Sequence, residues 1–342
     1  MRQELFVLDD QAHYFANSIR QASPEYDKIF DYLRGPGGML SIANHTGDGF
    51  LDHFFTKTAT HVACLNLPGI SDISGVNGMR SLELFAETRD KAPDRVILFG
   101  FVSPLDGEKA LQEMDHQFYD LGAKVFKWYP NDPLGRPIGW WADDPKIAYP
   151  FWEKLSQLGI KTVSIHKLPF NFMASKWQDP ADIDTAAGSF PELNFVVYHM
   201  GFPAIDKVAT MCSNRPNVYA DIGAPLAPAL TAKPLWFTEQ MCKFLALAPS
   251  DRLCWGSDMM VVPAGQELIE AFWNWQVPPL YQKGYGIQPL TSDDKKKIMG
   301  RTFAKLIGLD PDKVLEKIRN DSFSKKKSAK VKQFLTKANA AR

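Results

Sequence analysis

The stretch KTVSIH at residues 161–166 is typical of a strand that is buried on both faces of a parallel sheet. It ends in a histidine, and the stretch NFVVYH at residues 194–199 has the same form. Helical patterns separate runs of this kind, for example at 108–120, 146–158, 204–213 and 235–247. Strands that alternate with helices predict βαβ units and a parallel sheet.

Eight strand-like runs occur along the chain. They are Leu5–Asp9, His61–Leu67, Arg95–Phe101, Ala123–Trp128, Lys161–His166, Asn194–His199, Asn217–Ile222 and Arg252–Asp258. Eight βα units predict an α/β fold closed into a (β/α)8 TIM barrel, and 342 residues are enough for one such domain. A doubly wound open sheet is the alternative, but no GxGxxG motif follows the first run.

Two long segments depart from a minimal barrel. Residues 14–60 form an insertion after the first strand that suggests a lid or binding loop, although Gly47-Asp48-Gly49 within it is predicted as a glycine-rich turn. Residues 264–290 are rich in aromatic side chains, which suits a helix packed on the barrel or, alternatively, a lid or subunit interface. We therefore expect a homo-oligomer, with this aromatic segment as a plausible dimer surface.

The end of the chain has a different composition. Residues 311–342 hold ten Lys or Arg and three Asp or Glu, so this segment carries +7 and the rest of the chain carries −7. Apolar residues recur in it at helical spacing. We expect a barrel over 1–310 followed by a basic helical tail over 311–342, with Lys325, Lys326 and Lys327 solvated at its surface.

Composition and charge exclude several classes of function. The formal net charge is zero, which argues against a general nucleic-acid or membrane-surface role. No apolar run approaches the ~20 residues of a membrane span, and the first residues lack the features of a signal peptide. The four cysteines form no CxxC pair and are expected to be buried free thiols. A cytoplasmic enzyme with a small-molecule substrate is the simplest interpretation.

Catalytic side chains of a barrel gather at the carboxyl ends of its strands. His13 follows the first strand-like run, His166 and His199 end the fifth and sixth runs, and the eighth run ends in Asp258. Neutral imidazoles with one carboxylate are the ligand set expected for Zn²⁺ or a similar divalent ion.

The first run also places polar residues at alternating positions. Since alternate residues share a strand face, Asp9, Gln11 and His13 are expected to point into the barrel mouth and Asp10 toward the helices.

The chain resembles the amidohydrolase-related family that includes aminocarboxymuconate-semialdehyde decarboxylase and γ-resorcylate decarboxylase, within the amidohydrolase superfamily. The resemblance covers roughly residues 5–309. It is carried by Asp9-Asp10-Gln11-Ala12-His13, Gly122–Lys127, Gly159-Ile160 with Ile165-His166, His199-Met200-Gly201 with Pro203, Asp251-Arg252 with Gly256-Ser257-Asp258, and Ile298–Leu309.

The resemblance implies a role for each matching residue. His13, His166 and Asp258 would be metal ligands, and His199 would be the catalytic histidine beside the metal. Asp258 would also take part in catalysis. Zn²⁺ is favoured as the ion, and Mn²⁺ also suits such sites. Gln11 stands where the family has His or Glu.

Three interpretations of Gln11 follow. It is an unusual metal ligand, Asp9 compensates from the same face, or metal affinity is reduced or lost. We favour retained metal because the other three ligands are present.

The resemblance implies a metal-dependent, non-oxidative decarboxylase of a small aromatic or unsaturated carboxylic acid. A hydrolase that uses a metal-activated water to cleave a C–N, C–O or C–C bond requires the same residues and is the alternative. A catalytically weak, ligand-binding barrel is a third hypothesis. Side chains that could contact a substrate are Lys127, Lys167, His45 and Trp128.

Overall fold

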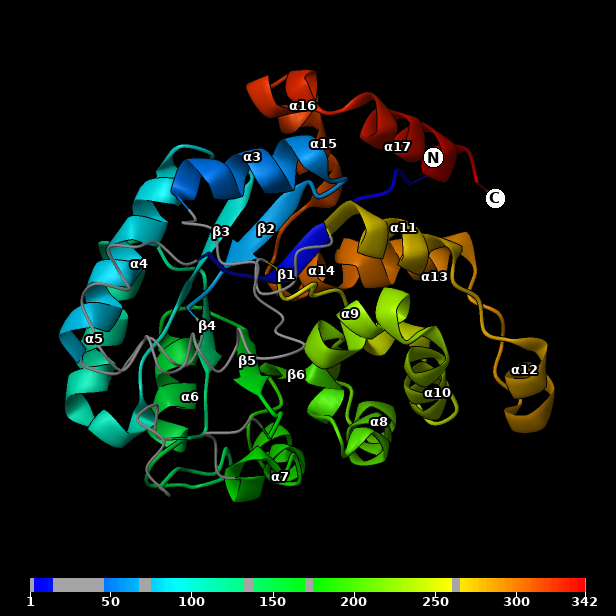
Figure 1. Cartoon of the computed structure of the whole chain (residues 1–342). Helices are drawn as coiled ribbons and strands as arrows, with labels where there is room; N and C mark the ends of the chain where they lie inside the picture. The colour runs from blue at the N-terminus through cyan, green and yellow to red at the C-terminus, as the bar shows by residue number, and fades with distance from the viewer. Residues whose placement is uncertain are drawn as a thin grey trace.

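The computed structural model of the chain describes residues 3–14, 46–67, 75–131, 138–169, 175–259 and 265–341. Eight parallel strands pair in sequence order (Figure 1). They are β1 (Leu8–Ala12), β2 (Val62–Leu65), β3 (Val96–Gly100), β4 (Val125–Trp128), β5 (Thr162–His166), β6 (Asn194–Tyr198), β7 (Val218–Asp221) and β8 (Leu253–Cys254).

The first and last strands meet and bring the sheet round into a barrel. The amide of Asp10 donates to the carbonyl oxygen of Trp255 at 3.0 Å, and the amide of Asp258 donates to that of Gln11 at 3.0 Å. A parallel bridge also joins Ala12 to Met259. The predicted TIM barrel is confirmed.

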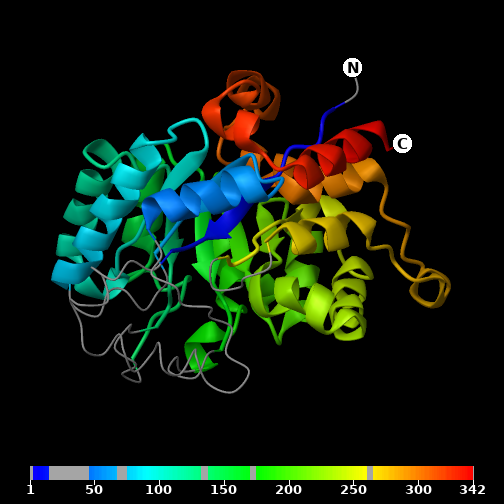
Figure 2. The same ribbon diagram turned by 45° about the horizontal axis from the view of Figure 1, so that its top comes forward.

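Helices surround the barrel (Figures 1 and 2). They are α3 (Gly47–Lys57), α4 (Gly75–Asp90), α5 (Glu108–Tyr119), α6 (Tyr149–Gln157), α7 (Asp182–Ser189), α8 (Ile205–Asn214), α9 (Gly223–Ala232), α10 (Pro234–Leu245), α11 (Gly265–Asn274), α12 (Pro279–Tyr285), α13 (Ser292–Lys296), α14 (Thr302–Leu306), α15 (Pro311–Ile318), α16 (Ser322–Lys326) and α17 (Ala329–Ala340). The four helical patterns quoted above correspond to α5, α6, α8 and α10.

Helix α14 covers the end of the barrel where the strands begin. Phe303 of α14 joins the core cluster of the barrel interior, and its ring stacks on Phe99 with centroids 6.1 Å apart. The hydroxyl of Thr162, at the start of β5, donates to the carbonyl oxygen of Leu306 at 2.8 Å. The opposite end of the barrel, where the strands finish, carries the candidate active site.

We expect Gly300→Ala to destabilise the fold. A Cβ at this position would lie 2.5 Å from the carbonyl oxygen of Phe6 and 2.6 Å from the amide nitrogen of Leu8, and both are backbone atoms. Such overpacking costs about 1–3 kcal/mol, measured as the free energy of unfolding in denaturant. Gly284→Ala is the control, because a Cβ there meets nothing within 4 Å. Equal stability of the two variants would contradict the close approach.

The basic tail is helical, as predicted, and it packs on the barrel. It lies beside the N-terminal segment (Figures 1 and 2), where the amide of Leu5 donates to the Asn339 side chain at 2.7 Å. The expectation that Lys327 is solvated is wrong, because only 6% of this residue is exposed. Its ammonium donates to the carbonyl oxygens of Thr58 at 2.7 Å and Thr60 at 3.2 Å. These carbonyls satisfy a group that would otherwise be costly to bury.

The segment 47–49 is the first turn of α3 and not the predicted glycine-rich turn. Thr46 is the N-cap, and its hydroxyl accepts from the amide of Gly49 at 3.0 Å, so the helix begins here. Asp48 forms an exposed ion pair with Lys91 at 2.7 Å. The rest of the predicted insertion, at 15–45, lies outside the described residues.

The aromatic segment 264–290 has two parts. Helix α11 buries Leu268, Ile269 and Phe272 against the barrel, which confirms the simpler interpretation for this part. Helix α12 has no buried residue and projects from the body of the molecule (Figure 1). Within the residues that the structure describes, no helix is both long and apolar enough to cross a membrane.

Candidate active site

His13 follows β1, and its two ring nitrogens have different partners. Nδ1 lies 2.7 Å from the carbonyl oxygen of Asn66, which only accepts, so Nδ1 carries a hydrogen. Nε2 lies 3.0 Å from Oδ1 of Asp258. In the neutral ring Nε2 then presents a lone pair to a carboxylate. Two acceptors at this distance require a proton or a cation between them.

His166 ends β5, and its ring is oriented by Gln178. Nδ1 lies 2.9 Å from Gln178 Oε1, which also accepts from the amide of Leu168 at 2.8 Å. The amide nitrogen of Gln178 donates to the Asn131 side chain, which is consistent with this orientation. Burial lowers the pKa of His166 well below its ordinary value. The ring is therefore neutral, with hydrogen on Nδ1 and a lone pair on Nε2, the form that binds a metal.

His199 lies directly after β6, and its ring centroid is 4.6 Å from that of His166. Neither ring nitrogen of His199 has a hydrogen-bond partner among the described residues, although the side chain is buried. Burial lowers the pKa of His199 to about 4, so the ring is neutral at pH 7.

The backbone also marks this region. His199 has φ 61° and Asp258 has φ 59°, values that are uncommon outside glycine. Such conformations persist where the surrounding structure fixes them, and they gather at functional sites.

Gln11 extends toward His199 and Asp221. A Cβ placed on Gly223 would lie 3.0 Å from Gln11 Oε1, 2.7 Å from His199 Nδ1 and 2.7 Å from Asp221 Oδ2. Three polar groups therefore approach one point, and the absent side chain of Gly223 leaves room for them. Gln11 Oε1 is buried without a partner among the described residues, so it is free to accept.

The expected orientations of Asp9 and Asp10 are wrong. Asp9 accepts from the amides of Ser257 at 3.0 Å and Gln11 at 3.2 Å, so it joins β1 to the segment after β8. Asp10 lies beside Asp221 in the barrel interior, because a Cβ on Gly256 would press against carboxylate oxygens of both. The β1–β2 register shifts between Asp9 and Ala12, which breaks the simple alternation used in the prediction.

Lys127 of β4 is a buried lysine of the barrel interior. Its ammonium has no hydrogen-bond partner among the described residues and lies 3.9 Å from the ring centroid of Tyr198. Burial lowers the pKa of Lys127 to about 8, and the charges of Asp258, Asp221 and Asp10 act in the opposite direction. The location suits the predicted contact with a substrate.

The buried ionisable side chains of the site include more carboxyl groups than cationic groups. Asp9, Asp10, Asp221 and Asp258 are buried near a single buried lysine. Burial raises the pKa of Asp9 to about 7 and that of Asp221 to about 6. Burial also acts to raise the pKa of Asp258, but the hydrogen bond and charge of His13 outweigh it and hold that pKa below its ordinary value. A cation bound here would offset this surplus of carboxylates.

The donor set fits a divalent ion in chemistry, although it is not gathered into a finished metal site. No three His, Cys, Asp or Glu side chains within the described ranges are grouped closely enough to hold a metal ion. The 3.0 Å between His13 Nε2 and Asp258 Oδ1 is nevertheless the separation of neighbouring ligands with bonds of about 2.1 Å. His166 ends β5 at the same end of the barrel, and the charge of Asp258 acts on its pKa, so it is the third candidate donor.

For three of the four residues predicted to contact a substrate, the structure either does not support the contact or does not describe the residue. Trp128 lies on the outer face of β4, fully buried against Trp152, with ring centroids 5.1 Å apart, so a substrate contact does not fit. The ammonium of Lys167 is also already bound, donating to Asp182 at 2.8 Å and to the carbonyl oxygens of Trp177 and Asp179 at 3.1 Å. His45 lies outside the described residues.

Sequence reasoning did not identify the groups that orient the two histidines. Asn66 acts through its backbone carbonyl, which every residue carries, so its side chain gave no signal. Gln178 lies twelve positions after His166 in a short 3-10 helix, and no strand end marks it.

Fold and site together define a class, a (β/α)8 barrel with histidine and aspartate side chains where its strands end. A family model described as amidohydrolase matches residues 72–309, which is more than half of the chain. The chain belongs to this amidohydrolase family. The matched region begins after Gln11 and His13, so their roles remain predictions.

Solved structures of similar fold cover nearly the whole chain. A dihydroxybenzoic acid decarboxylase from Polaromonas with bound manganese is 16% identical, with TM-score 0.56, and the match covers 94% of this chain and 99% of the other. A 5-carboxyvanillate decarboxylase from Novosphingobium aromaticivorans, also with bound manganese, is 14% identical, with TM-score 0.58 and coverage of 89% and 97%. A 4-oxalomesaconate hydratase from Rhodopseudomonas palustris is 16% identical, with TM-score 0.59 and coverage of 92% and 98%. No curated protein sequence matches the chain.

Proposed function

We propose that this chain is a metal-dependent enzyme that removes CO2 from a small aromatic or unsaturated carboxylic acid without oxidation. The observation that carries the proposal is the pair of histidines His13 and His166, each with hydrogen on Nδ1 directed to an oxygen acceptor. Both rings therefore keep Nε2 for a ligand bond, and Asp258 supplies the carboxylate. The manganese-containing decarboxylases of similar fold support the choice of reaction.

In this proposal His13, His166 and Asp258 hold the ion, and Gln11 is a further candidate ligand. When bound, the ion would supply Lewis-acid stabilisation of the carboxylate and a neighbouring oxygen of the acid. Zn²⁺ and Mn²⁺ both suit the donor set, and Mn²⁺ is to be tested first because two decarboxylases of similar fold carry it. The four cysteines are free and buried, which is consistent with the proposed cytoplasmic location.

Residues of the chain would bind the negatively charged acid and supply the proton to the carbon that loses CO2. The C–C bond to the carboxylate breaks, its electron pair stays on the substrate carbon, and that carbon takes a proton while CO2 leaves. His199 or Asp258 would take this proton up from solvent and deliver it to the carbon, and His199 suits the role because both of its nitrogens lack a partner among the described residues. Lys127 would attract the acid through its charge.

The test is CO2 release by protein loaded with Mn²⁺ or Zn²⁺, with 2,6-dihydroxybenzoate and 5-carboxyvanillate as the first acids. In D2O the product should carry one deuterium at the carbon that lost the carboxylate. Chelator-treated protein is the control and should release none until the metal is restored. If protein with stoichiometric metal releases no CO2 from any aromatic or unsaturated acid, the proposal fails.

A hydrolase or hydratase is the second candidate. The unpartnered nitrogens of His199 would then stabilise a developing negative oxygen, and Asp258 would take the proton of the attacking water. The hydratase of similar fold supports this alternative. Assays of the same metal-loaded protein on ester, amide and unsaturated acid substrates distinguish it, since hydrolysis and hydration consume water and release no CO2. Absence of bound metal would instead favour a ligand-binding barrel.

Lys127→Met is expected to raise KM for an acid substrate at least about tenfold, since a hydrogen bond to a charged group is worth about 1.5–3 kcal/mol. Methionine keeps the length and apolar stem of the side chain, so its packing contacts should be retained. Lys124→Met is the matched control, because Lys124 is exposed at the start of the same strand region. An unchanged KM in Lys127→Met would remove this residue from the substrate site.

A further inference from the structure

The projecting helix α12 exposes its apolar side chains. Leu280 is 78% exposed and Tyr285 is 68% exposed. The segment is nevertheless held at both ends, because Val277 before it and Ile287 after it are only 1% and 5% exposed. Packing within this chain therefore anchors both ends of α12 (Pro279–Tyr285), here called the arm, and leaves Leu280 exposed on it.

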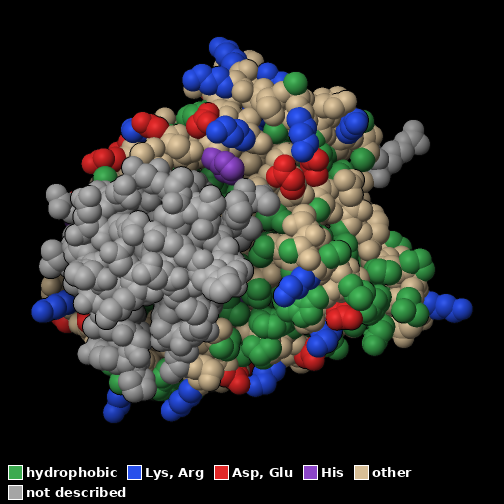
Figure 3. Space-filling view, viewed as in Figure 1, with side chains coloured by type: hydrophobic (Ala, Val, Ile, Leu, Met, Phe, Trp, Pro, Cys, Tyr) green, Lys and Arg blue, Asp and Glu red, His purple; other side chains and the backbone are tan. Residues whose placement is uncertain are grey.

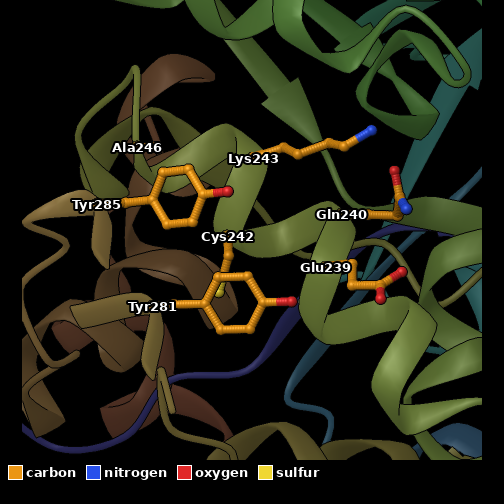
Figure 4. A pocket seen from close by; sticks show the side chains of 7 residues that line it. All are labelled: Glu239, Gln240, Cys242, Lys243, Ala246, Tyr281 and Tyr285. Carbon is orange, nitrogen blue, oxygen red and sulfur yellow. The ribbon is translucent and has the colours of Figure 1, made fainter. Parts of the chain in front are cut away.

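A pocket of about 270 Å³ separates the arm from α10 (Figure 4). Its apolar part is made by Cys242 and Ala246 of α10 and by the rings of Tyr281 and Tyr285. Those two rings stack with centroids 5.9 Å apart and face α10. The pocket therefore offers an apolar hollow next to the protruding Leu280.

More exposed apolar side chains lie at the two ends of α10. Leu235 is 69% exposed and Leu247 is 46% exposed. With Leu280 and Tyr285 they make four of the six large hydrophobic side chains that are exposed in the described parts of the chain. Hydrophobic side chains gather on this face in the space-filling view (Figure 3). A concentration of this kind marks an interaction surface.

The same surface carries charges of both signs. Glu239 and Lys243 of α10 border the pocket, and Lys283 lies on the arm. None of the three takes part in an ion pair with another described residue. One patch, formed by α10 and the arm, thus carries the protruding Leu280, the pocket, the anionic Glu239 and the cationic Lys243 and Lys283.

We propose that this patch binds a second copy of the chain about a two-fold axis, arm against arm. Leu280 of each copy would enter the pocket of the other, and Glu239 of each would face Lys283 of the other. A two-fold contact requires one surface that is complementary to itself, and this patch combines both halves of such a contact. A surface that binds a different protein would need only one of these two halves.

The first experiment is sedimentation velocity of the full chain over concentrations of about 0.1–50 μM. The wild-type protein should sediment as a dimer at the upper concentrations. Leu280→Asp should raise the dissociation constant at least about tenfold, because it places a charge at the centre of the apolar contact. Tyr119→Asp is the matched control, since Tyr119 is 69% exposed on α5 and should leave the dissociation constant unchanged.

A charge exchange tests the orientation of the two copies. Glu239→Lys and Lys283→Glu should each weaken the dimer, and the double variant should recover most of the loss. Circular dichroism establishes that each variant is folded. If Leu280→Asp did not fold, Tyr285→Ser and the charge exchange would decide. A wild-type chain that is monomeric throughout overturns the proposal, and so does a dimer that none of these variants weakens.

Discussion

His166→Ala should lose its bound metal and, with it, the activity of the protein. The imidazole is held by Gln178 so that Nε2 is available, and alanine offers no donor in its place. Loss of a group that only orients a ligand already costs about 10–100-fold in metal affinity, so loss of the ligand itself should cost more than about 100-fold. The measurement is elemental analysis after equilibrium dialysis against buffered metal.

Two further variants make this result specific. Gln178→Ala should reduce affinity by the smaller factor of about 10–100, because the ring is present but no longer oriented. His116→Ala removes an exposed histidine of α5, paired with Asp120, and should leave metal content unchanged. Stoichiometric metal with undiminished affinity in His166→Ala would show that the ion, if present, is bound by other residues.

Asp321→Ala is expected to have the largest effect on stability. Arg95 is 1% exposed, and its guanidinium donates to Asp321 Oδ2 at 2.5 Å and Oδ1 at 2.9 Å. Removing the carboxylate leaves a buried charge without its anionic partner, which costs about 3–5 kcal/mol. The melting temperature should fall by at least about 5 °C, measured by calorimetry. Asp321 also caps α16, which adds to the loss.

Asp94→Ala provides the comparison. It breaks the ion pair between Asp94 and Lys317, which also joins the barrel to the tail but has both side chains more than half exposed. An exposed pair contributes about 0–1 kcal/mol, so the melting temperature should hardly change. Similar losses in the two variants would mean that burial of Arg95 is not what makes the tail contact strong.

The ends of the strands were the most informative part of the sequence. Apolar runs that close on His166 and His199 predicted both the barrel and the residues that meet at its mouth, because parallel strands bring their carboxyl ends together. The four helical patterns were also reliable, since their apolar residues recur at the period of a helix that packs on one side.

Orientation was harder to predict wherever a local irregularity intervened. Asp10 lies beside Asp221, against the expected orientation, in a strand whose register with β2 shifts between Asp9 and Ala12. Trp128 ends a strand like the site residues, but its position in the alternation directs it to α6. Lys327 belongs to a basic run, yet only contact with the carbonyl oxygens of Thr58 and Thr60 determines that it is buried.

The order of strands and helices, the barrel they form and the strand ends that carry histidine and aspartate could all be predicted from the amino-acid sequence. These follow from local periodicity and from the fixed geometry of parallel βα units. Two properties needed the three-dimensional arrangement: which nitrogen of His13 and His166 is left for a ligand, and the burial of Lys127 without a hydrogen-bond partner among the described residues. Such properties depend on groups distant in sequence, as the 53 positions between His13 and Asn66 illustrate.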